Sequence, residues 1–122
     1  MNDIVIIPGK SDSPTIQMNI KTNVYELIGN SFPDNPKETY APLTIKIGQN
    51  VSKGEEVTLI INLDYINTGS KNILLSIFSL MEQNKSKSEI RWYYSDEDMF
   101  EEIEFLEECG ETNINKIFKP LV

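Results

Sequence analysis

The order of strand-like and helix-like segments most restricts how this 122-residue chain can fold. The run EVTLIINL, residues 56–63, is apolar and rich in Val and Ile, which is typical of a central strand buried on both faces of a sheet. The next apolar run, SKNILLSIFSLMEQN at residues 70–84, has helical spacing instead. Strands that alternate with helices in this way indicate an open α/β sheet with helices packed on it.

The first third of the chain predicts two paired strands before any helix. Residues 4–14 begin with a short apolar run and continue with turn residues, so we expect an extended arm lying on the domain. The segment TIQMNIKT, residues 15–22, alternates apolar and polar side chains and predicts a half-buried strand, with residues 23–30 as its antiparallel partner. The inward-facing side chains of this strand would be Ile16, Met18 and Ile20.

Two further helices and two further strands complete the pattern. A helix should begin at Pro36, capped by Asp34 or Asn35, and close at Gly54. Residues 88–94 predict a strand, residues 96–109 a helix stopped by Gly110, and residues 113–121 a last short strand or tail. We therefore predict one domain over residues 1–122, with a single open mixed sheet of about five strands and about three helices.

Composition narrows the possible functions. The net charge of −8 makes nucleic acid a poor ligand, because its phosphates repel an acidic surface. The chain has no histidine, so it lacks the usual general base and the usual zinc ligand. Cys109 is the single cysteine and excludes an internal disulfide. With no signal peptide or membrane span visible in the sequence, we expect a cytoplasmic protein without cofactor, metal or membrane contact.

The junction between the apolar strand and the following helix, residues 64–70, holds more capping side chains than one helix needs. Asn67, Thr68 and Ser70 could each cap the helix, and Gly69 lies among them. The start of a helix presents free N–H groups and a partial positive charge, which both favour a phosphate. Thr68 therefore occupies a place where a phosphate would be tolerated. The simpler alternative is that one of these residues is only the N-cap.

The surfaces of two predicted helices, residues 70–84 and 96–109, can each be interpreted in two ways. In the helix of residues 70–84, Leu75 and Phe78 lie off the centre of the core stripe, so either another helix covers them or they form an exposed patch for a partner. The helix of residues 96–109 is acidic and carries no base, and is either a docking face for a basic partner or a solvated surface. Its acids are Asp96, Glu97, Asp98, Glu101, Glu102, Glu104, Glu107 and Glu108.

Four segments together resemble the SiaC-type bacterial regulatory phosphoproteins. LDYINTGSKNILLSIFSLMEQ is similar to the family's signature, in which a Tyr-Leu-Asn-Thr-Ser-Ser run leads into an apolar helix. IPGKSDSPTI, GNSFPDNPKETYAPL and IRWYYSDEDMFEEIEFLEE resemble other parts of that family, so the likeness runs along nearly the whole chain. Gly69 stands where a serine is common, which removes a neighbouring hydroxyl and would make the loop more pliable.

The resemblance implies a non-enzymatic switch with a STAS-like fold, similar to the anti-sigma-factor antagonists. It implies that a serine/threonine kinase phosphorylates Thr68, that a phosphatase removes the phosphate, and that the unphosphorylated form activates a diguanylate cyclase in cyclic di-GMP and biofilm signalling. The expected partner-binding residues are Tyr65, Asn67, Thr68, Gly69, Ser70, Lys71, Leu75 and Phe78. The competing classes are a small-ligand module, a partner-switching module with a different output, and an enzyme, for which only scattered carboxylates are available.

Overall fold

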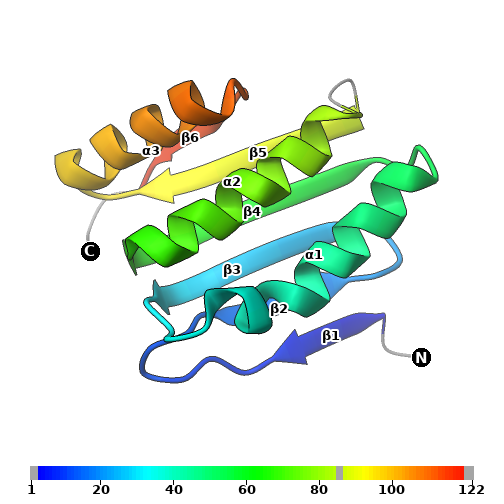
Figure 1. Ribbon diagram of the computed structural model, residues 1–122, viewed down its shortest axis with the longest axis horizontal. Helices are drawn as coiled ribbons and strands as arrows, with labels where there is room; N and C mark the ends of the chain where they lie inside the picture. Colours follow the sequence, from blue (N-terminus) through cyan, green and yellow to red (C-terminus); the bar gives the residue numbers. More distant parts are fainter. Residues whose placement is uncertain (1–2, 85–86, 120–122) are drawn as a thin grey trace.

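The computed structural model describes residues 3–84 and 87–119, and within them six strands form one sheet with three helices (Figure 1). This confirms the predicted mixed α/β class, although the sheet has six strands and not five. The elements in chain order are β1 (Ile4–Ile7), β2 (Thr15–Asn19), β3 (Val24–Ser31), α1 (Pro36–Ser52), β4 (Val57–Ile66), α2 (Thr68–Glu82), β5 (Ser88–Tyr94), α3 (Glu97–Gly110) and β6 (Asn115–Phe118).

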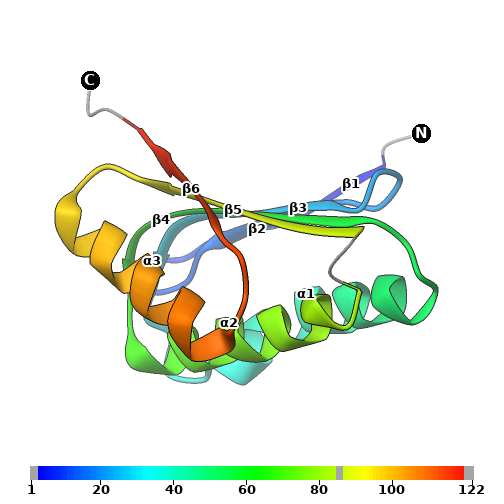
Figure 2. The same ribbon diagram turned by 90° about the horizontal axis from the view of Figure 1, so that it is seen from above.

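The strands lie in the sheet in the order in which they occur in the chain, from β1 to β6. β1, β2 and β3 pair antiparallel, whereas β3, β4, β5 and β6 pair parallel. Each helical crossover therefore moves to the next strand in the same direction. Because such crossovers have one hand, all three helices lie on the same face of the sheet, as Figure 2 shows. The order never reverses, so the sheet has no switch-point crevice.

The single layer of helices corrects the prediction for β4. This strand was expected to be buried on both faces, but buried residues alternate with partly exposed ones from Val57 to Leu63. The helix-facing side chains form the core, while Thr58, Ile60 and Asn62 lie on the face that carries no helix. A continuous apolar run in the sequence does not by itself distinguish these two arrangements.

The N-terminal segment is also different from the extended arm that we expected. Residues Ile4–Ile7 form an edge strand, with Val5 opposite Met18 of β2. The neighbouring β2 ends at Asn19, three residues before the predicted end, because the Asn19 side chain accepts hydrogen bonds from the backbone N–H groups of Lys21 and Thr22. Ile20 consequently lies in the turn with 43% of its surface exposed, and the prediction that it faces inward is wrong.

Capping side chains set the starts of α1 and α3. The Asn35 side chain caps α1 by accepting from the Glu38 N–H, and the helix continues through Pro42. Asp96 caps α3. The C-terminus of α3 differs from the prediction, because Glu111 and not Gly110 takes the left-handed conformation, with φ 49°.

The buried side of α1 carries one polar residue, Asn50, among the apolar ones. The Tyr25 hydroxyl donates to Asn50 Oδ1, and Asn50 Nδ2 donates to Glu55 Oε1 at 2.9 Å and to Asn23 Oδ1 at 3.3 Å. Burial, together with the nearby Glu55 carboxylate, raises the pKa of Tyr25 to about 12, so this hydroxyl remains a donor. The network ties the end of α1 to the start of β3.

Among the described residues, no helix is long and apolar enough to span a membrane.

This network makes a testable prediction. Asn50→Ala should lower the free energy of unfolding by about 1–3 kcal/mol, because it leaves the buried Tyr25 hydroxyl without its acceptor. Urea denaturation followed by circular dichroism would measure the change. Gln49→Ala, at the exposed neighbouring position, is the control and should stay within about 0.5 kcal/mol. Equal effects of the two substitutions would contradict a role for the network.

Candidate functional site

The junction predicted from the sequence lies at the carboxyl ends of β3 and β4, where β4 leads into α2 (Figure 1). Asn67 is the N-cap: its side-chain oxygen accepts from the Ser70 N–H at 2.9 Å, and its own N–H donates to the carbonyl of Ser31 at 2.9 Å. The helix therefore begins at Thr68, two residues earlier than predicted. Of the three candidate capping residues, Asn67 has this role.

Ser70 has a different role, because its side chain is fully buried. The Ser31 hydroxyl donates to Ser70 Oγ at 2.8 Å and lies 2.6 Å from the Tyr40 hydroxyl. Burial raises the pKa of Tyr40 to about 12 against the opposing effect of the Ser31 hydrogen bond, so the chain of hydroxyls is uncharged. These bonds join β3, α1 and α2 beneath the junction. The prediction that Ser70 contacts a partner is therefore wrong.

Thr68 is exposed at the first position of α2. Within residues 3–84 and 87–119, no group hydrogen-bonds to its hydroxyl. The hydroxyl is therefore reachable from solvent and is not needed as a cap, while the start of the helix provides a partial positive charge beside it. An exposed hydroxyl at the start of a helix is compatible with the predicted phosphorylation, which stays a prediction here.

Gly69 lies in the first turn of α2 and not in a loop, which corrects the interpretation that it makes the loop pliable. A Cβ atom at Gly69 would lie 3.2 Å from Pro36 Cγ, so the start of α1 packs closely on this turn. A serine at this position would require Pro36 to move by a few tenths of an ångström. The residue therefore shapes the contact between the two helix starts.

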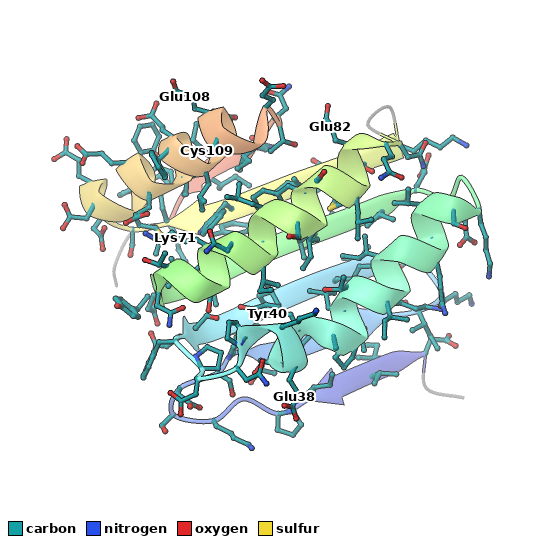
Figure 3. All side chains as sticks on the ribbon, in the orientation of Figure 1. Glu38, Tyr40, Lys71, Glu82, Glu108 and Cys109 are labelled. Carbon is teal, nitrogen blue, oxygen red and sulfur yellow. The ribbon has the colours of Figure 1, made fainter. Side chains whose placement is uncertain are left out.

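Lys71 projects from the side of α2 that faces α3 (Figure 3). Its ammonium group lies 2.7 Å from the Glu102 carboxylate, and the two side chains are 19% and 39% exposed. A shallow depression beside this ion pair is lined by Lys71, Asp98, Glu101, Glu102 and Phe105. The depression thus combines one cation, three carboxylates and an exposed aromatic ring.

Leu75 and Phe78 are covered by other parts of the chain. Phe78 is fully buried, with its ring edge-to-face against Trp92 at 6.4 Å between centroids. Leu75 packs against the core, and its Cδ2 atom lies 3.3 Å from where a Cβ of Gly110 would be. Intramolecular cover is therefore correct for Phe78, and the prediction that this side chain contacts a partner is wrong. Leu75 is half-buried, so its contact with a partner stays a prediction.

An exposed aromatic pair beside the junction includes one residue that sequence reasoning missed. Phe32 and Tyr65 are 41% and 54% exposed, and their rings meet edge-to-face at 5.7 Å. The parallel register that places Ser31 opposite Ile66 brings the two rings together. That register is a long-range property of the sheet. Tyr65 could be predicted as a candidate because it lies in the junction, whereas no local signal pointed to Phe32.

The acidic surface of α3 is partly used by the fold itself. Glu102 pairs with Lys71, and Glu107 pairs with Lys116 at 2.7 Å and accepts the Ile114 N–H at 2.8 Å. The remaining acids of the helix are exposed. Docking on a basic partner therefore remains a prediction for these exposed acids alone.

The separate roles of the junction residues predict different effects on stability. Asn67→Ala should lower the free energy of unfolding by about 1 kcal/mol, because the N–H of Ser70 loses its acceptor. Thr68→Ala should change it by less than about 0.5 kcal/mol, because the exposed hydroxyl bonds to nothing in the described chain. Urea denaturation of both variants would measure this difference. An equal loss in both variants would show that Thr68 also stabilises the helix.

The family model of the SiaC family regulatory phosphoproteins matches residues 7–118. A curated, uncharacterized protein of Pseudomonas aeruginosa is 28% identical over 92 residues, which cover 72% of this chain and 73% of that protein.

The fold is similar to that of solved SiaC structures from Pseudomonas aeruginosa. A chain in the crystal structure of the diguanylate cyclase SiaD with its activator SiaC has a TM-score of 0.86 and 22% identity, over 94% of this chain and 99% of that one. Apo-SiaC has a TM-score of 0.82 and 22% identity, over 95% and 98%. At this identity the structures show a shared fold. Together with the family match along most of the sequence, they show that this chain belongs to the SiaC family of regulatory phosphoproteins.

Proposed function

We propose that this protein is a non-enzymatic switch in which reversible phosphorylation of Thr68 controls the binding of a protein partner. A serine/threonine kinase would add the phosphate from ATP, and a phosphatase would remove it. The unphosphorylated form would bind and activate an output protein such as a diguanylate cyclase, in the cytoplasm, as part of cyclic di-GMP and biofilm signalling. The protein itself would supply a surface and no catalytic group.

The proposal rests on the exposure of Thr68, which lies between two residues that stabilise the start of α2. Asn67 caps α2 and Ser70 is bonded in the core, so a phosphoryl group on Thr68 would not disturb either contact. The phosphate would add about 1.5 to 2 negative charges at the start of a helix, where they are electrostatically favoured. Membership of a family of regulatory phosphoproteins supports the same role.

A diguanylate cyclase is the favoured output because the similar chain of Pseudomonas aeruginosa comes from a complex of SiaD with its activator SiaC. A different output protein is the alternative. The exposed rings of Phe32 and Tyr65 provide an apolar contact area beside Thr68, and aromatic anchors of this kind dominate many interfaces. A phosphate between such anchors and a partner would have to be desolvated, which opposes binding.

Phosphorylation of Thr68 can be tested directly and compared with another exposed hydroxyl. The protein, incubated with ATP and a serine/threonine kinase of the proposed signalling system, should gain one phosphate, mapped by mass spectrometry to Thr68. Thr68→Ala should abolish the modification and leave partner binding permanently on. Thr22→Ala, which removes a distant exposed hydroxyl, should leave the modification unchanged. A phosphate on any other residue would contradict the assignment.

The partner surface can be tested with matched exposed side chains. Tyr65→Ala should weaken binding to the proposed diguanylate cyclase partner by about tenfold or more, since truncation of a central aromatic anchor typically costs over 1 kcal/mol. Ile45→Ala, which truncates a 61% exposed side chain on α1, should leave the affinity unchanged. Isothermal titration calorimetry would measure both. If Tyr65→Ala bound as tightly as the parent chain, the interface would lie elsewhere.

A further inference from the structure

Lys71 is placed to respond to a phosphate on Thr68. Both residues belong to the first turn of α2, three positions apart, and side chains at this spacing are neighbours on a helix surface. Lys71 is also the one cation among the five residues that line the depression between α2 and α3. In the unmodified chain it is already paired, at 2.7 Å, with Glu102.

We propose that phosphorylation of Thr68 moves the Lys71 ammonium group from Glu102 to the phosphoryl oxygens, so that Lys71 positions the phosphate and Glu102 is released. This inference rests on the proposed function, because it requires a phosphate at Thr68. It assigns Lys71 as a phosphate-binding residue and not as a direct partner contact.

The competition between the two anions favours the phosphate. Glu102 carries one negative charge and belongs to a different helix, whereas the phosphoryl group carries up to two and is attached one turn away on the same helix. The ion pair with Glu102 is also partly exposed, and pairs of this kind are weak and easily exchanged. The remaining carboxylates of the depression, Asp98 and Glu101, would repel a phosphate that Lys71 did not hold.

The exchange would make the surface more negative than the charge of the phosphate alone would. Glu102 would lose its counter-ion and join Asp98 and Glu101, which form no ion pair within residues 3–84 and 87–119. The first turn of α2 and the first two turns of α3 would therefore become acidic together. A partner bound to the unmodified junction would meet both new charges at once.

The exchange can be tested without any kinase, by installing phosphothreonine at residue 68 of the full chain during translation. Phosphorus NMR would then follow the second ionisation of the phosphoryl group. Lys71→Met should raise that pKa by about 0.5 unit, because a nearby cation favours the dianion. Lys21→Met, in the distant β2–β3 turn, should leave it unchanged. Glu102→Gln should lower it more than Glu101→Gln, because only the former also frees Lys71.

A double-mutant cycle tests the other half of the exchange. Lys71→Met and Glu102→Gln should be coupled in urea denaturation of the unmodified protein, and this coupling should disappear in the phosphorylated protein. An unchanged phosphoryl pKa in Lys71→Met, or coupling that persists after phosphorylation, would overturn the proposal. Failure of the kinase to modify Thr68 would instead contradict the proposed function and leave these measurements valid.

Discussion

The hydrogen bonds that hold the first turn of α2 are the constraint on which the functional site depends. The Asn67 side chain accepts a hydrogen bond from the Ser70 N–H. The Ser70 hydroxyl is bonded to the buried Ser31 hydroxyl, which is bonded in turn to that of Tyr40. Because three elements meet in these bonds, the helix start is fixed without any contribution from the Thr68 hydroxyl. Because the Thr68 hydroxyl does not stabilise the helix start, it can be modified without unfolding the protein. This is the physical basis of the proposed switch.

The single layer of helices determines what surrounds that hydroxyl. With α1, α2 and α3 side by side on one face, the start of α2 has a neighbour on each side (Figures 1 and 2). Pro36 of α1 packs on Gly69, and Glu102 of α3 pairs with Lys71. The site therefore has an apolar flank and a charged flank, and a change of charge at Thr68 acts mainly on the second.

Local signals predicted much of this molecule, and long-range pairing explains what they missed. The order of the elements from β2 onward and a cap for α1 at Asp34 or Asn35 follow from short stretches of sequence, and the structure selects Asn35. The place of Thr68 at the junction follows in the same way, although the helix was expected to begin at Ser70. The burial of Phe78 and the meeting of Phe32 with Tyr65 depend on how distant segments pack. The same holds for the N-terminal edge strand, since its pairing with β2 is not encoded by its four apolar residues alone.

The strands have the same order in the chain and in the sheet, and this affects how the protein folds. Each strand pairs with the strand that precedes it in the chain, so no pairing must wait for a segment made much later. Short loops cost less entropy to close than long ones, and chains rich in such contacts fold quickly. The sheet can therefore grow strand by strand as the polypeptide leaves the ribosome, beginning with the antiparallel strands β1, β2 and β3.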